Sequence, residues 1–324
     1  MAPRRSGGGG TGYSNASCPD AFNTPYAQAA LAFVVLFLVL YTGIFISTFF
    51  IRKKSGAGKK LIGVPFVAAL FLQVIARILS LVSQVMSECD NINYIDYWNI
   101  NVASAIMSSL ANAALLFVFV YVLNSMLHKQ FGNMSSGSKT VLLITIGVAF
   151  AVILADVSMF AYVALADNSL ESNWDFALLV SSGLDLAYDI VWMIVVIISA
   201  AMSLSNVSAL RSRRLPGGDL FGWVTALYVT LFVNASLGVV YSSSIYWPVT
   251  PSLGASLALS YIIGLVKCLA FITLLGIAKH ISWNQTIEKT EQTYAPVTQQ
   301  QITYGYGNGQ QDYYQQTPEL VHVK

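Results

Sequence analysis

The sequence predicts an all-α membrane protein, a bundle of seven transmembrane helices, from three observations. First, seven apolar stretches are each long enough to cross a bilayer, since about 20 residues rising 1.5 Å each span a hydrocarbon core of about 30 Å. Second, 56% of the 324 residues are hydrophobic and only 10% are charged, whereas about a quarter of a typical soluble domain is charged. Third, loops rich in lysine and arginine alternate with loops that have neither.

Three regions follow one another along the chain. Residues 1–26 are rich in Gly, Ser and Asn and are expected to form a flexible tail. Residues 27–280 hold the seven-helix domain. Residues 281–324 are rich in Gln, Tyr, Thr and Gly, so they cannot bury a core and are expected to be disordered. The seven predicted helices have the approximate bounds 27–51, 61–87, 100–127, 140–166, 176–204, 219–246 and 252–279.

Lysine and arginine mark one side of the predicted membrane. Among the six loops between the helices, only those after the first, third and fifth contain them, as Arg52, Lys53, Lys54, Lys59, Lys60, Lys129, Lys139, Arg211, Arg213 and Arg214. Cytosolic loops carry the excess of lysine and arginine in membrane proteins. We therefore expect the N-terminus outside and the C-terminus in the cytosol.

Two features belong to the predicted outer side. Asn15 lies in the sequon Asn-Ala-Ser and is a possible glycosylation site. Cys18 and Cys89 both fall in the oxidising compartment, where a disulfide could tie the tail to the loop before the third helix. Two free thiols near the membrane surface are the alternative. The third cysteine, Cys268, lies inside the last helix and is expected to pack as a small apolar residue.

Six consecutive helices, the second to the seventh, each carry a strongly polar residue near mid-membrane. These residues form the predicted ligand-binding or charge network: Arg77, Asn112, Asp156, Asp185, Asp189, Asn234 and Lys267. A charged side chain at the bilayer centre costs on the order of 2.5–3.5 kcal/mol, so these groups are expected to face the bundle interior. The spacing of the polar residues agrees with this expectation, because residues four apart, such as Ser181, Asp185 and Asp189, share one helix face.

The network contains two cations and three acids. Arg77 and Lys267 can neutralise two of the acids, and the remaining acid is expected to be protonated in the apolar interior. Two interpretations remain open. The network could line a wet cavity for a ligand, an ion or a proton, or it could only fix the register of the helices.

Several function classes find no support in the sequence. The net charge of +2 does not indicate the strongly basic surface that nucleic-acid-binding proteins have. No Cys/His spacing predicts a metal site, and we expect no cofactor and no catalytic residue. Lys267 in the last helix is similar to the lysine of retinal-binding rhodopsins. However, Ile263 stands where the microbial type has an aspartate, and the third helix has no acid at all.

The arrangement also resembles two groups of membrane proteins. The topology is similar to that of G-protein-coupled receptors, but the Asp/Glu-Arg-Tyr and Asn-Pro-x-x-Tyr motifs of the rhodopsin-like class are missing. The run Phe-Leu-Gln-Val-Ile-Ala-Arg-Ile-Leu-Ser at 71–80, the short loops and the acidic loop after the second helix are similar to fungal seven-transmembrane proteins. That loose group is receptor-like or lipid-translocating-exporter-like, and the resemblance covers 27–280.

These observations favour receptor-like sensing of an unknown small ligand by a protein that is not an enzyme. A transporter or lipid exporter is one alternative, and an intramembrane enzyme resembling small terpene cyclases, with the aspartates as acids, is another. The expected partners are the lipid bilayer, the ligand and a cytosolic partner at 205–218 and 281–324, with no nucleic acid. The expected location is the plasma membrane or the endomembrane system.

Overall fold

The computed structural model describes Cys18 and residues 21–89, 94–130, 136–165, 174–212, 218–244 and 252–283. Within these residues, seven helices are long and apolar enough to cross a membrane. The predicted fold class, an all-α bundle of seven spanning helices, is therefore confirmed. Asn15 and residues 284–324 lie outside the described part of the chain.

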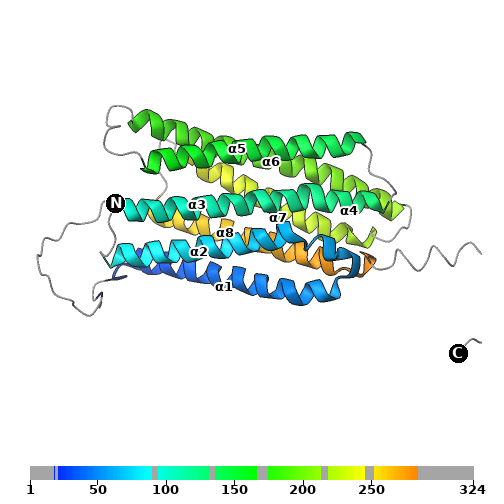
Figure 1. Ribbon diagram of the computed structural model, residues 1–324, viewed down its shortest axis with the longest axis horizontal. Helices are drawn as coiled ribbons and strands as arrows, with labels where there is room; N and C mark the ends of the chain where they lie inside the picture. The colour runs from blue at the N-terminus through cyan, green and yellow to red at the C-terminus, as the bar shows by residue number, and fades with distance from the viewer. Residues whose placement is uncertain are drawn as a thin grey trace, which may run out of the picture. The chain divides into compact units, whose positions relative to one another are not determined.

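Six of the seven spans are single helices, and the third combines three segments (Figure 1). The single helices are α1 (Pro25–Lys54), α2 (Val64–Glu88), α5 (Ser136–Leu165), α6 (Trp174–Ser212), α7 (Phe221–Ser243) and α8 (Leu253–Lys279). The third span consists of α3 (Tyr94–Phe117), the π-helical segment η2 (Val118–Val122) and α4 (Leu123–Lys129). Short 3-10 turns are η1 (Gly56–Lys60), η4 (Gly218–Leu220) and η6 (Ile281–Trp283).

Local signals explain where the outermost helices begin. Pro25 occupies the first turn of α1, and the Thr24 side chain accepts a hydrogen bond from the Ala27 backbone N–H at 3.1 Å. Ser252 caps α8 in the same way, through the backbone N–H of Ala255 at 3.3 Å. Such caps satisfy N–H groups that have no partner within the helix.

The largest difference from the predicted bounds is at the end of α6. The segment 205–218, which we expected to be a loop, is helical as far as Ser212. Val207 and Leu210 are fully buried there, so one face of the helix continues to pack against the bundle beyond the apolar run. Residues 213–217 of this segment lie outside the described residues.

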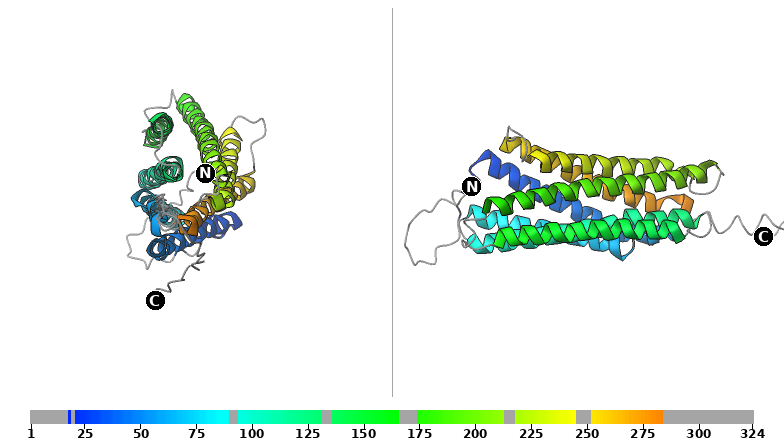
Figure 2. Two further views of the ribbon diagram at one scale, coloured as in Figure 1. Left: turned by 90° about the vertical axis from the view of Figure 1, so that its right-hand side faces the viewer. Right: turned by 90° about the horizontal axis from the view of Figure 1, so that it is seen from above.

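The spans pack in chain order and close into a ring. Each helix contacts the next span along the chain, and α1 also contacts α8. The end-on view in Figure 2 shows this arrangement. The side chains that fill the interior are largely aromatic on the α1–α8 side, where Phe37, Tyr41, Phe66 and Phe271 are fully buried.

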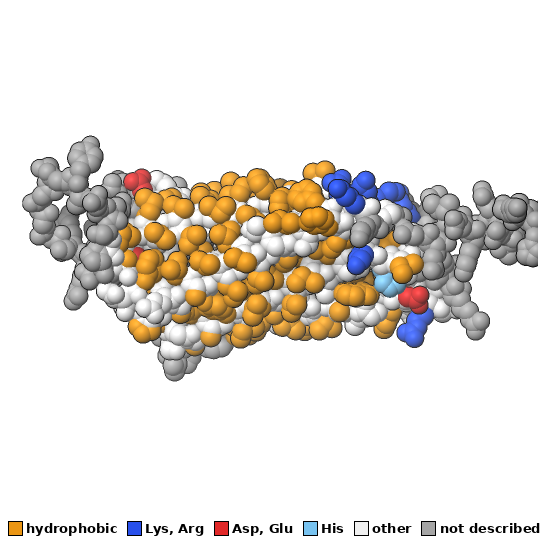
Figure 3. Space-filling view, turned by 90° about the horizontal axis from the view of Figure 1, so that it is seen from below, with side chains coloured by type: hydrophobic (Ala, Val, Ile, Leu, Met, Phe, Trp, Pro, Cys, Tyr) orange, Lys and Arg blue, Asp and Glu red, His pale blue; other side chains and the backbone are white. Residues whose placement is uncertain are grey.

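The outer surface has an apolar middle and a basic end (Figure 3). Large apolar side chains such as Val39, Ile144 and Val229 are more than half exposed, as expected where helices meet lipid chains. The basic end carries Arg52, Lys53, Lys59, Lys60, Lys129, Lys139, Arg211 and Lys279. We call the opposite end, where Cys18 and Cys89 lie, the disulfide end.

Candidate functional site

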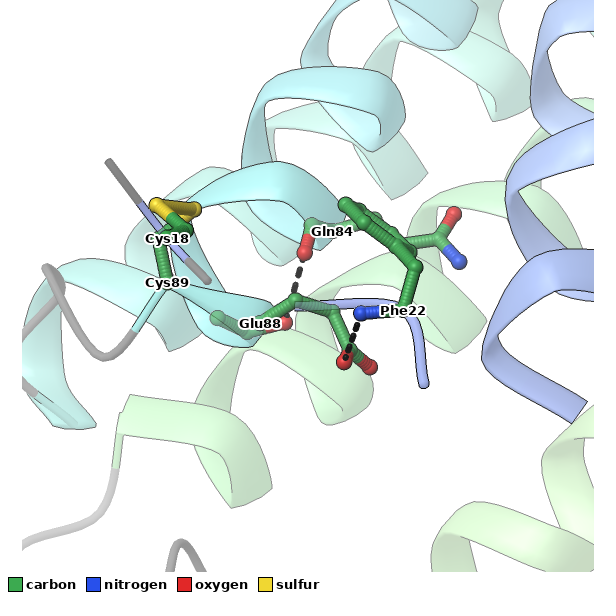
Figure 4. The surroundings of a disulfide bond; sticks show 6 residues. Cys18, Phe22, Gln84, Glu88 and Cys89 are labelled. Atoms are coloured by element: carbon green, nitrogen blue, oxygen red, sulfur yellow. Dashed lines mark hydrogen bonds between the residues drawn. A yellow bond between two sulfur atoms is a disulfide. The ribbon is translucent and has the colours of Figure 1, made fainter. Parts of the chain in front are cut away.

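A disulfide joins Cys18 to Cys89 at a Cα–Cα distance of 5.4 Å and connects the segment before α1 to the end of α2 (Figure 4). Two hydrogen bonds reinforce this connection. The Phe22 N–H donates to Glu88 Oε2 at 3.5 Å, and Gln84 Nε2 donates to the Ala27 carbonyl at 3.5 Å. The start of α1 is thereby fastened to α2 at this end of the bundle.

Arg77 of α2 lies among aromatic rings of α1. Its Cζ is 5.5 Å from the ring centroid of Phe33, 5.9 Å from that of Phe37 and 6.0 Å from that of Tyr41. These rings are four residues apart, so they share one face of α1, and each attracts the guanidinium through its π face. Among the described residues, no carboxylate oxygen lies within 4.0 Å of Arg77, so the acid expected from the sequence is not its direct partner.

A cavity of about 380 Å³ lies between α2, α3 and α5 and is called here the α2–α3 cavity. It extends from near mid-membrane at Arg77 toward the start of α3 at the disulfide end. Its polar lining includes Arg77, Ser80, Asn101, Ser104 and Ser108, and Phe160 of α5 contributes an aromatic wall.

Two serines in this cavity hold α2 and α3 together. The hydroxyls of Ser80 and Ser104 are 2.9 Å apart, and each lies 2.9 Å from the carbonyl oxygen of Ala76. Small residues of this kind allow helix backbones to approach closely in membranes.

A smaller cavity, of about 140 Å³, lies between α3, α6, α7 and α8 and is called here the inner cavity. Four residues of the predicted network line it: Asn112, Asp189, Asn234 and Lys267. Asn112 Nδ2 donates to the Tyr188 hydroxyl at 3.2 Å. The buried side-chain oxygens of Asn112 and Asn234 have no hydrogen-bond partner among the described residues.

Lys267 lines the inner cavity without a direct ion pair. In the described part of the chain, no carboxylate oxygen lies within 4.0 Å of its ammonium group. Asp189 lines the same cavity, but its Oδ2 accepts a short hydrogen bond from Ser242 of α7. The cavity thus brings Lys267 and Asp189 together without a salt bridge between them.

The other two aspartates form a pair across α5 and α6, within electrostatic range of Asp189. The carboxyl groups of Asp156 and Asp185 lie within hydrogen-bonding reach of each other. Two carboxylates repel, so a carboxyl pair in contact is stable when one member carries a proton. The seven predicted residues therefore occupy three places: Arg77 in the α2–α3 cavity, four residues around the inner cavity, and this acid pair.

The sequence interpretation missed a buried polar cluster nearer the basic end. It consists of Asn124, Ser199, Ser203 and Tyr228, called here the Asn124 cluster. Ser203 donates to Asn124 Oδ1 at 2.8 Å, and the Tyr228 hydroxyl is 2.7 Å from both serine hydroxyls. The four-residue spacing of the two serines was the available signal.

The π-helical segment η2 supplies the backbone acceptors of this cluster. The carbonyl of Phe119 accepts from Tyr228 at 3.2 Å and from Ser199 at 3.3 Å, and the carbonyl of Val120 accepts from Asn124 at 2.9 Å. A π-helical turn widens the helix and leaves a carbonyl outside the regular ladder, and such turns are frequent at functional sites. The cluster thereby links the third span to α6 and α7.

The fold and its interior define an integral membrane protein with seven spanning helices and polar cavities inside the bundle. Among the described residues, no group of His, Cys, Asp and Glu is arranged to hold a metal ion. Comparisons with protein-family models, with curated proteins and with solved structures gave no match to this chain.

Proposed function

We propose that this protein is a receptor-like sensor whose small ligand binds in the α2–α3 cavity. The observation that carries this proposal is the cavity itself, about 380 Å³ with a cation, hydroxyls and aromatic walls. Small-molecule sites are typically clefts of about 300–1,000 Å³ with a few polar groups among apolar walls.

The contacts beyond the cavity support a signalling role. Lys267 of α8, at the inner cavity, is an electrostatic neighbour of Arg77. The inner cavity borders α6 and α7, where Asp189 bonds Ser242. Nearer the basic end, the Asn124 cluster connects α4, α6 and α7. In this proposal, ligand binding shifts the packing of α6 and α7, because a ligand moves an equilibrium by its differential affinity for two packings.

The proposed orientation places the disulfide end outside and the basic end in the cytosol. A disulfide is typical of an oxidising compartment, and clustered lysine and arginine are typical of cytosolic loops. Asn15 is then a glycosylation site, and residues 205–218 and 281–324 are the proposed contacts for a cytosolic partner. The proposed location is the plasma membrane or the endomembrane system, in a protein related to fungal seven-transmembrane proteins.

The test combines a conformational reporter with a flux assay. A fluorophore on Ser212→Cys, at the exposed end of α6, is monitored in nanodiscs during a ligand screen, with a label on Ser136→Cys of α5 as the comparison. We expect a ligand that changes the Ser212 signal and shows no net movement across proteoliposomes.

Two other outcomes would replace the sensor with another function. Net tracer movement would identify a transporter or lipid exporter. Conversion of an apolar lipid that is lost in Asp156→Asn would identify an enzyme, because a protonated carboxyl pair can act as a general acid.

A further inference from the structure

We propose that the α2–α3 cavity is an oxyanion site, in which Arg77 binds the carboxylate or phosphate group of the ligand. This inference rests on the proposed function, because it names the chemical class of the ligand in the same cavity. The ligand carries an anionic head and an apolar body.

The guanidinium of Arg77 has a buried N–H group without an acceptor in the described residues. A guanidinium presents five N–H donors in a planar fork and cannot be deprotonated in proteins. The Nε of Arg77 is buried and has no hydrogen-bond partner in the described residues. The three rings of α1 attract the charge, and Arg77 also lines the cavity. A carboxylate or phosphate matches this fork with two parallel hydrogen bonds.

A second basic side chain lies near Arg77. Lys267 lies within electrostatic range of Arg77, and no carboxylate oxygen lies within 4.0 Å of either group in the described residues. Asp189 is the acid that lines the inner cavity, and Ser242 already occupies one of its oxygens. The guanidinium of Arg77 keeps its positive charge, and a charge in a low-dielectric interior concentrates anions in the space beside it.

The remaining walls indicate the rest of the ligand. Ser108 and Asn101 offer side-chain hydrogen-bonding groups in the cavity that Arg77 lines, while Tyr97 and Phe160 present aromatic rings. A cavity of about 380 Å³ exceeds what an inorganic ion fills, so the walls fit an anion with an aromatic or aliphatic body.

The experiment compares probes that differ in the charge of the head group. The full-length protein in phosphatidylcholine nanodiscs is titrated with phenylbutyrate, phenylbutanol and phenylbutylamine, which share one body, and with phenyl phosphate. Binding is followed by the shift in melting temperature. A parallel arm uses nanodiscs that contain phosphatidic acid, and Arg77-dependent stabilisation there would identify a lipid head group as the source of the oxyanion.

Four variants accompany the wild type. Arg77→Gln removes the charge, Arg77→Lys keeps the charge without the fork, and Ala105→Leu fills the cavity while Arg77 remains. Lys139→Gln, at the basic end, is the matched control for loss of a cation. We expect at least one anionic probe to bind the wild type and the control. Its affinity should fall about 10-fold or more in Arg77→Gln, the range for a lost charge-assisted hydrogen bond, less in Arg77→Lys, and clearly in Ala105→Leu.

The inference fails if the alcohol or amine binds as tightly as the anions, or if Arg77→Gln binds them unchanged. It also fails if no anion binds in either type of nanodisc. If Arg77→Gln does not fold, Ala105→Leu decides, since unchanged anion binding in that variant would overturn the site. A neutral or cationic probe that binds and is lost in Ala105→Leu would leave the sensor proposal standing without the oxyanion. Anion binding accompanied by net flux would support the oxyanion site and overturn the sensor proposal.

Discussion

The carboxylate of Asp189 on α6 lies against Gly238 on α7, at a place where any larger residue would collide with it. A Cβ at position 238 would lie 2.8 Å from Asp189 Oδ1 and 3.0 Å from its Cγ. One turn further along α7, Ser242 donates its hydroxyl to the other carboxylate oxygen. Gly238 and Ser242 together hold the Asp189 carboxylate between α6 and α7, one by leaving space for it and the other by a hydrogen bond.

Gly238→Ala is therefore expected to destabilise the protein. The added methyl must displace the carboxylate or separate α6 from α7, and overpacking of this kind costs about 1–3 kcal/mol. That cost outweighs the gain of up to about 1 kcal/mol from replacing a helical glycine by alanine. Thermal unfolding in nanodiscs measures the difference.

Gly222→Ala is the matched control, because it lies in the same helix and a Cβ there would meet nothing within 4 Å. It should unfold at the wild-type temperature or above. Equal melting temperatures for the two alanine variants would mean that Asp189 has free room to move.

Gly264→Ala should separate α1 from α8. A Cβ at 264 would lie 2.5–2.9 Å from three atoms of the Phe37 ring, and that ring is fully buried. We expect a loss of about 1–3 kcal/mol, which Phe37→Leu in the same chain should partly relieve. Gly254→Ala, also in α8 but with nothing within 4 Å, serves as the control. A double variant no more stable than Gly264→Ala would show that the ring is not the obstacle.

The number and position of the spans could be predicted from the sequence, because length and apolarity alone decide whether a helix can cross a bilayer. The partner of Arg77 could not be predicted from the sequence. The rings of Phe33, Phe37 and Tyr41 are spaced to share a face, but which helix meets that face depends on the order of the ring of helices. A charge-balance argument therefore favoured an acid where the structure has aromatic rings.

The polar layer was predicted as one network. Asn112, Asp189, Asn234 and Lys267 do meet, since each lies on an inward face of its helix. The acid pair on α5 and α6 does not line this cavity, because rotation of α5 about its axis is set by packing that the sequence does not reveal. The Asn124 cluster was missed because it depends on the π-helical turn, which arises from contacts between distant helices.

Tyr228→Phe should destabilise the Asn124 cluster without changing its shape. The variant removes the hydroxyl that bonds both Ser199 and Ser203, in a buried environment. Leaving such buried groups short of a partner costs about 1–3 kcal/mol. Thr230→Ala, an exposed change in the same helix whose hydroxyl bonds only its own backbone, should have little effect.

A double-mutant cycle between Tyr228 and Ser203 tests the hydrogen bond between their hydroxyls. In the double variant of Tyr228→Phe and Ser203→Ala, the total loss of stability should be smaller than the sum of the single losses, because either change alone already breaks the same hydrogen bond. Strict additivity would show that the two hydroxyls do not interact. If the cluster also carries the proposed signal, Tyr228→Phe should reduce the ligand-evoked change at Ser212 while ligand affinity stays close to that of the wild type.

Lys267→Met tests whether the lysine is paired with an acid, as the charge count favoured, or faces the inner cavity alone. Pairing predicts that loss of the lysine is strongly destabilising, about 3–5 kcal/mol, since it leaves an uncompensated buried charge. It also predicts that Asp189→Asn or Asp185→Asn partly restores stability. Because no carboxylate oxygen lies within 4.0 Å of Lys267 in the described residues, we expect instead that Lys267→Met melts at or above the wild-type temperature and that neither asparagine variant rescues it. The single and double variants are compared by thermal unfolding, and a coupling of more than about 1 kcal/mol with either aspartate would restore the ion pair.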